Sequence, residues 1–156
     1  MRGYSQIYVP HKLAKIRGRM DSLVLGSFTP IAFQHTVKDY VAEIEFMKDM
    51  SGLGLLLPKR LANGLYLYSV RIKSTQPKSE CIVTLVHEAV HIHYGLFAEF
   101  LSKRENDEVE GLVEKIAIGS VETYPREFEN MYDELTQDHV TSPNFPLVRI
   151  IREPVR

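Results

Sequence analysis

The stretch TLVHEAVHIHYG, residues 84–95, contains three of the six histidines of this 156-residue chain. Two of them, His87 and His91, are four positions apart, and Glu88 directly follows the first. The residues around them are almost all apolar, and their spacing predicts a helix over residues 80–94 that the final glycine ends. A helix that is apolar on nearly every side lies at the centre of a domain, so this helix decides where the core is.

Histidines at positions i and i+4 of a helix lie on one face, about one turn apart. The imidazoles of His87 and His91 can therefore point at one metal ion, and Zn²⁺ suits two neutral imidazoles, a carboxylate oxygen and a water. Glu88 is rotated by about 100° from His87, where it can accept a proton from the metal-bound water. The H-E-x-x-H pattern thus predicts a hydrolytic site with one zinc ion per chain. His93 lies on another face, so we expect a surface or structural role for it.

The third ligand has to come from another part of the chain. Glu99 would lie about 12 Å further along the axis if the helix continued, although Gly95 breaks it. Glu110 and Glu114 are better candidates, because a nearby dication would remove the repulsion between carboxylates four residues apart. We favour Glu110 as the ligand, with Glu114 accepting the other N–H of His87. The two roles could be reversed, and both side chains could instead be solvated surface groups.

The remaining elements are predicted from spacing and turn signals. Apolar residues at helical spacing predict one amphipathic helix over residues 33–50, which Gly52 ends. The runs GLLL (54–57) and LYLYSVRI (65–72) predict a β-hairpin. Ser79 is a plausible N-cap for the histidine helix.

A further helix is expected to begin near Asn106 or Asp107, because Asp107 and Glu110 have the spacing of a capping box. Its predicted core stripe consists of Val109, Leu112, Val113, Ile116 and Ala117. Pro125 is well placed at the first position of another helix, and the proline-containing tail from residue 142 is expected to be extended. These elements predict one α+β domain over residues 1–156 with its core at about 33–136, between a basic arm (1–32) and the tail (142–156).

Composition limits the classes of function and location. The net charge is −1, which argues against a general nucleic-acid binder. All charged residues before Asp21 are basic and residues 105–138 are mainly acidic, which indicates two solvated surfaces or a basic arm that contacts an acidic partner or its own acidic half. Cys81 is the single cysteine, and neither an apolar signal core nor a membrane-spanning run is visible. We therefore expect a soluble cytoplasmic protein.

Two motifs carry a resemblance to a known family. HEAVH, residues 87–91, and EVEGLVEKIA, residues 108–117, resemble the motifs of the gluzincins and, more narrowly, of the ImmA/IrrE metallopeptidases. The likeness covers about residues 35–120; Gly111 stands where alanine is usual and Val113 lies close to a usual phenylalanine. It implies a zincin-like domain in which a small, mostly antiparallel sheet or hairpin packs on the H-E-x-x-H helix and a following glutamate-bearing helix, with Glu110 as the ligand.

The resemblance also implies partners. ImmA/IrrE proteins often act on a DNA-binding regulator, which would here be a separate chain, and a peptide substrate would add as a strand beside the hairpin through residues 65–72. The compact minigluzincins are a second resemblance; some are inhibited by a chain terminus in the cleft, a part that the tail at 144–156 could play. An oxyanion donor is also needed, and Tyr94, at i+3 from His91, is the first candidate. The others are Tyr124, Tyr132, Arg126 and His139.

The leading hypothesis is a cytoplasmic zinc metallopeptidase that hydrolyses a peptide bond in a specific protein. The alternative is a regulatory or binding module that keeps a zincin fold and acts by contact without proteolysis. Glu88 favours the enzyme, because a structural zinc site has no use for a general base and would be closed by a fourth protein ligand. A zinc hydrolase of small amides and a structural protein without metal are further alternatives.

Overall fold

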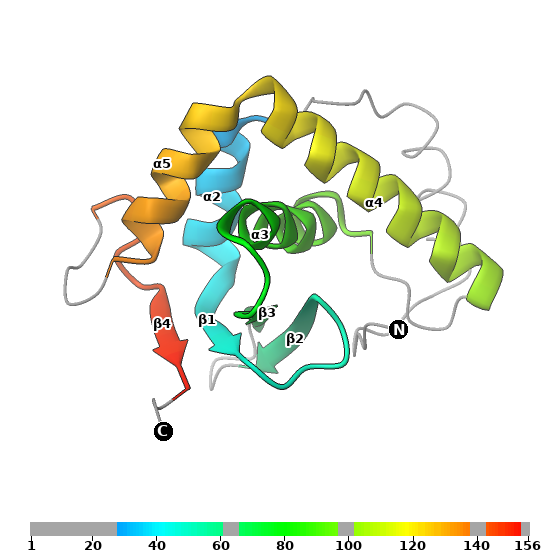
Figure 1. The fold of residues 1–156 in the computed structure, drawn as a ribbon, viewed down its shortest axis with the longest axis horizontal. Coiled ribbons are helices and arrows are strands. Elements are labelled where there is room, and N and C mark those ends of the chain that lie inside the picture. The colour runs from blue at the N-terminus through cyan, green and yellow to red at the C-terminus, as the bar shows by residue number, and fades with distance from the viewer. Residues whose placement is uncertain (1–27, 61–65, 97–101, 138–142, 154–156) are drawn as a thin grey trace.

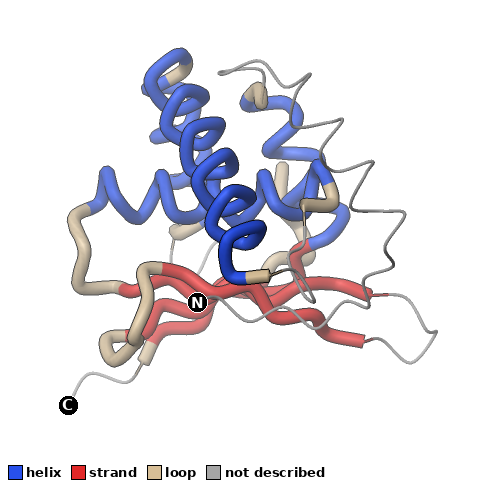
Figure 2. Tube along the Cα trace, turned by 90° about the vertical axis from the view of Figure 1, so that its right-hand side faces the viewer, coloured by secondary structure: helices blue, strands red, loops and turns tan. Residues whose placement is uncertain are grey.

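The structure is a computed structural model that describes residues 28–60, 66–96, 102–137 and 143–153. Within these ranges, four helices lie on one face of a four-stranded sheet (Figures 1 and 2). The helices are α2 (Pro30–Tyr40), α3 (Lys78–Tyr94), α4 (Lys103–Thr123) and α5 (Pro125–Leu135). The strands are β1 (Val41–Met47), β2 (Gly54–Arg60), β3 (Tyr66–Lys73) and β4 (Arg149–Arg152). The chain is thus α+β, as the sequence predicts, and none of the described helices is both long and apolar enough to span a membrane.

The sheet has the strand order β2-β3-β1-β4. Strands β2 and β3 pair antiparallel and form the predicted hairpin. Strand β1 runs parallel to both β3 and β4. The expectation of a mostly antiparallel sheet is therefore wrong, because the chain returns to β4 through three helices, and so long a connection allows parallel pairing.

The single helix predicted over residues 33–50 is also wrong. Helix α2 ends at Tyr40, and β1 begins at the next residue. An irregularity in the register between Val41 and Glu43 shifts the alternation of the strand. As a result Val41, Ile44 and Phe46 all face the core, at spacings of three and two that resemble the start of a helical pattern.

The helix starts differ from the expected caps. Helix α3 begins at Lys78 with Pro77 as its N-cap and no capping side chain, so Ser79 lies inside the first turn and the predicted Ser79 cap is wrong. Helix α4 begins at Lys103, ahead of the predicted capping box at Asp107. Its N-cap is Ser102, whose Oγ accepts from the Glu105 amide at 3.2 Å and donates to Glu105 Oε1 at 3.0 Å. Pro125 occupies the first turn of α5, as predicted.

Helix α3 is at the centre of the fold, between the sheet and the other helices (Figure 1). Eleven of its residues are buried, and the valine and isoleucine stripe of α4 packs against it. Leu112 is the one member of the predicted stripe that is only partly buried. Two phenylalanines outside the range 33–136, Phe28 and Phe145, also lie in the core, and both rings contact Phe33.

The tail adds strand β4 at the edge of the sheet opposite β2. Arg152 stacks over the ring of Phe46 and donates to the carbonyl of Thr136, which holds the strand against α5. The described part of the tail therefore lies at the edge of the sheet opposite the edge that β2 of the hairpin forms. The basic arm lies outside the described residues except for its last part, from residue 28.

The observed caps predict a difference between two serines. We expect Ser102→Ala to lower the free energy of unfolding by about 1 kcal/mol, because the amide of Glu105 loses its acceptor. Ser79→Ala should change it by less than about 0.5 kcal/mol, because Ser79 is exposed and caps no helix. Urea unfolding of both variants measures the difference, and an equal loss at Ser79 would contradict the assignment of caps.

Candidate metal centre

The two helix histidines point into the interface between α3 and α4. His87 and His91 are buried, and their Nε2 atoms lie 3.1 Å apart. The carboxylate of Glu110 spans both rings, with Oε2 at 2.9 Å from Nε2 of His87 and Oε1 at 3.1 Å from Nε2 of His91. One ligand atom from each of the three residues lies within 4.8 Å of the others, so the group could hold a metal ion.

The hydrogen bonds around the group favour a cation at its centre. Nδ1 of His91 lies 2.7 Å from the carbonyl of Leu96, which can only accept, so this nitrogen donates. In a neutral ring the opposite nitrogen, Nε2, then carries a lone pair. This lone pair and the carboxylate of Glu110 face each other at 3.1 Å and repel, and a cation that both coordinate removes the repulsion. The donor set of two imidazoles and one carboxylate fits zinc chemistry.

The turn at the end of α3 supplies the carbonyl that orients His91. Gly95 adopts a left-handed conformation with φ of 63°, as its position after the predicted helix suggested. The reversal brings Leu96 back over the last turn, where its amide donates to the carbonyl of His91 and its own carbonyl accepts from the ring. Sequence analysis identified the glycine stop but missed the role of Leu96, because a backbone carbonyl leaves no signal in residue types.

Glu114 lies one turn beyond Glu110 on α4 and approaches the other side of His87. Its Oε2 is 3.2 Å from Nδ1 of His87, whereas Glu110 faces the Nε2 atoms of both histidines. A carboxylate in the position of Glu114 fixes the orientation of the ring and makes its opposite nitrogen a better ligand. The geometry therefore gives the two glutamates different surroundings, with Glu110 inside the group and Glu114 at its more exposed flank.

Glu88 is completely buried beside the first residue of β2. A methyl group added to Gly54 would lie 3.2 Å from Oε1 of Glu88 and only 2.5 Å from Cγ2 of Thr84. Only glycine therefore lets the strand approach the helix this closely. The sequence places Gly54 at the start of the predicted strand run GLLL but gives no sign that glycine is needed there.

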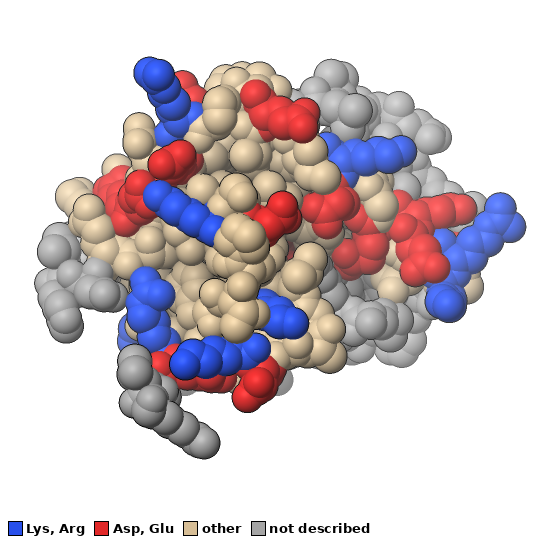
Figure 3. Space-filling view, in the orientation of Figure 1, with Lys and Arg blue, Asp and Glu red and all other residues tan. Residues whose placement is uncertain are grey.

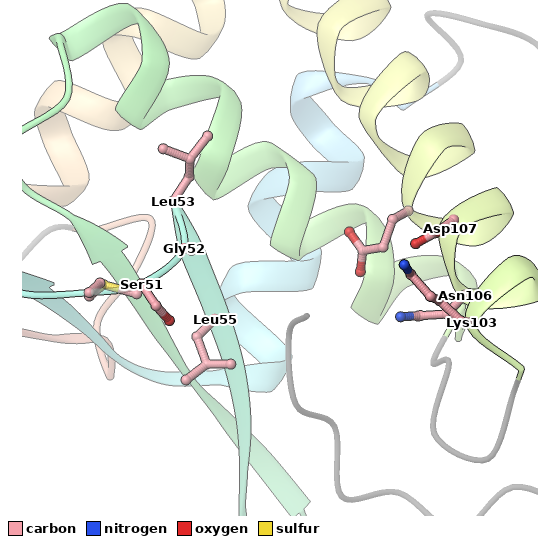
Figure 4. Close-up of a pocket in the computed structure, with 10 residues that line it drawn as sticks. Ser51, Gly52, Leu53, Leu55, Lys103, Asn106 and Asp107 are labelled. Carbon is pink, nitrogen blue, oxygen red and sulfur yellow. The ribbon is translucent and has the colours of Figure 1, made fainter.

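A cleft of about 570 Å³ opens beside the group, between β2 and α4 (Figure 4). One wall is formed by residues 50–55, the loop before β2 and its first two positions. The other wall consists of Lys103, Asn106, Asp107 and Glu110 from the first turns of α4. Glu110 belongs both to this wall and to the histidine group, so a molecule in the cleft would lie next to a metal bound there.

The strand beside this cleft is not the one expected. Both edges of β3 are already paired, to β2 and to β1, so a peptide cannot add along residues 65–72 and that expectation is wrong. Within the described ranges, β2 and β4 are the two edge strands, and the first residues of β2 line the cleft. The described tail, to residue 153, lies at the opposite edge of the sheet and does not line the cleft.

The structure does not bring the other candidate residues to the cleft. The ring of Tyr94 packs against Phe28 and His93, with centroids at 6.3 and 4.7 Å. His93 contacts Thr36 on α2 through Nδ1 at 3.2 Å, and burial lowers the pKa of this imidazole. Of the remaining oxyanion candidates, Tyr124, Tyr132 and Arg126 lie on or next to α5, and none lines the cleft.

Two candidate residues from the sequence, Glu99 and His139, lie outside the described residues.

Acidic side chains gather over α4 on the right of Figure 3, as the charge pattern of the sequence suggested. Asp107, Glu110 and Glu114 also belong to α4, and the two glutamates contact His87, so acidic side chains of this helix border the histidine group. Comparison with protein-family models, with curated proteins and with solved structures found no match.

The close approach at Gly54 can be tested by adding one methyl group. We expect Gly54→Ala to lower the free energy of unfolding by about 2 kcal/mol, because the new Cβ overlaps Thr84. Gly111→Ala is the matched control: nothing lies within 4 Å of its added Cβ, so alanine in the middle of α4 should raise stability by about 1 kcal/mol.

Chemical denaturation of both variants checks the two signs. The double variant Gly54→Ala with Thr84→Ser should recover part of the loss, because serine lacks the Cγ2 methyl that the new Cβ meets. A neutral effect of Gly54→Ala would contradict the close packing of β2 on α3.

Proposed function

We propose that this chain is a zinc-dependent metallopeptidase that hydrolyses a peptide bond in a specific protein. The observation that carries the proposal is the buried Glu88 adjacent to a group of two imidazoles and a carboxylate, with a cleft alongside. A group that only stabilised the fold would need no second buried carboxylate, and burying one without a function is costly. The cleft is also large enough for several atoms of a peptide.

His87, His91 and Glu110 would hold the zinc ion. When bound, the ion lowers the pKa of a coordinated water and polarises the carbonyl of a substrate. Glu88 accepts the proton of the attacking water at a carboxylate oxygen and donates it to the leaving nitrogen. The carbonyl of Leu96 keeps His91 in the tautomer that presents Nε2. Glu114, 3.2 Å from Nδ1 of His87, would do the same for that ring by accepting its N–H.

The more specific proposal is a gluzincin of the ImmA/IrrE type. Its support is the HEAVH motif together with the order of elements, in which α2 and the hairpin precede the histidine helix α3 and the glutamate helix α4. The substrate we propose is a protein, and a regulator protein is the partner that the resemblance suggests. An extended segment of it would lie along the edge of β2, where the described strand has no neighbour in the sheet.

Substitution of Glu88 separates the enzyme from a binding module with the same fold. We expect purified protein to contain about one zinc per chain, and Glu88→Gln to keep the metal while hydrolysis falls at least about 100-fold, because glutamine cannot accept the proton. Metal analysis and cleavage of quenched peptide libraries measure the two quantities.

Glu108→Gln is the matched control, since Glu108 is an exposed residue of α4 that pairs only with Arg104 in the described structure. Activity that survives in Glu88→Gln would exclude Glu88 as the base. A wild-type chain that binds zinc and a partner protein but cleaves nothing would support the binding module.

The two α4 glutamates should differ in their effect on metal affinity. Glu114→Gln should weaken zinc binding by about tenfold, because it changes only the orientation of His87. Glu110→Gln should weaken it by more than about 100-fold, because a charged ligand is lost. Titration against a competing chelator gives both affinities, and the reverse order would exchange the two roles.

A further inference from the structure

Asn106 has an unexpected environment in the wall of the cleft. It lies one turn before Glu110 on α4 and lines the cleft with it (Figure 4). Asn106 is only 5% exposed, yet its Oδ1 accepts no hydrogen bond from the described part of the chain. A buried amide oxygen without a donor costs free energy that an apolar side chain of similar size would not. Because Asn106 lines the cleft, a ligand there can supply the donor once rotation of the side chain turns the buried oxygen towards it.

The opposite wall of the cleft has a different chemistry. Met50, Leu53 and Leu55 line it, and Leu53 is 48% exposed although leucine is usually buried. An exposed leucine inside a cleft gains most when an apolar group of a ligand covers it. On the α4 side of the cleft, the opposite charges of Lys103 and Asp107 compensate each other. This pair of residues therefore gives the cleft no preference for a charged side chain of a ligand.

We propose that Asn106 is a substrate-binding residue whose Oδ1 accepts a hydrogen bond from a backbone N–H of an extended peptide, while an apolar side chain of that peptide packs on Leu53. An extended chain offers both features, because its N–H groups and side chains point in different directions from the backbone. The inference rests on the proposed peptidase function and adds its substrate class: a segment with an apolar residue next to the bond that is cut.

The position of Asn106 connects this contact to the chemistry. Residues four apart on a helix lie on one face, so Asn106 and Glu110 both face the cleft from α4. A peptide held at Asn106 is therefore held at a fixed distance from the histidine group. This arrangement supplies a binding contact that neither the H-E-x-x-H motif nor the glutamate helix motif contains.

The test uses the zinc-loaded full chain and three hydroxamate probes. Acetohydroxamate contacts only the metal site. A succinyl hydroxamate with an isobutyl side chain and two backbone amides adds the contacts proposed here, and its single-ester analogues each lack one N–H. Wild-type protein should bind the diamide about fivefold more tightly than one of the esters, the ratio expected for one hydrogen bond between neutral groups.

The variant Asn106→Leu should lose this amide-to-ester ratio while its affinities for zinc and acetohydroxamate stay within about twofold. A purely structural role of Asn106 would lower the affinity for amide and ester alike and leave the ratio unchanged, and that result overturns the inference. A wild-type protein that binds the diamide and both esters equally tightly overturns it too. Failure of the wild type to bind zinc overturns the proposed function itself, which the zinc titration reports separately.

Leu53 is tested with the same probes. Leu53→Ser should reduce the preference for the isobutyl probe over a probe with hydrogen in its place by about fivefold, because part of the covering surface is removed. Leu147→Ser is the matched control: this leucine is 82% exposed and does not line the cleft. Equal preferences in Leu53→Ser and in the wild type would exclude the apolar contact.

Discussion

The placement of polar groups inside the apolar interface between α3 and α4 constrains the rest of the structure. His87, His91 and Glu110 meet there with their ligand atoms within 4.8 Å of one another, so the group could hold a metal ion. The two helices must therefore pack closely and in one register, which the stripe containing Val109 and Val113 provides. The carbonyl of Leu96 orients His91 from outside the group, and Glu114 lies 3.2 Å from Nδ1 of His87.

The parts of the fold that sequence predicts well are those with a local signal. The histidine helix, its glycine stop, the hairpin and the proline start of α5 all follow from spacing or from one special residue. The contact between His87 and Glu110 could be predicted for a chemical reason. Buried histidines on an apolar helix need polar partners, and the sequence contains few side chains that could supply them. His93 was expected to lie outside the metal site because it is on another face of the helix, and it contacts α2 instead.

The parts that sequence did not predict depend on contacts distant in the chain. The irregularity in β1 placed apolar residues at spacings typical of a helix, and only pairing with β3 determines that Val41 begins a strand. The need for glycine at position 54 arises from Thr84, thirty residues later, and the carbonyl of Leu96 has no residue-specific signal. Asn106 was read as a helix start, because its place in the wall of a cleft opposite β2 is visible only in the folded chain.

The parallel pairing of β1 with β4 has a consequence for biosynthesis. Strand β1 is near the beginning of the described chain, whereas β4 is its last element and Phe145 just precedes it. During translation, the edge of β1 that pairs with β4 and the ring of Phe33 that contacts Phe145 lack these partners until residues 145–152 have been made. Arg149 and Arg152 then bring two positive charges to this edge, which discourages pairing with a strand of another molecule. Strand β4 and Phe145 thus complete a sheet whose other strands are made much earlier.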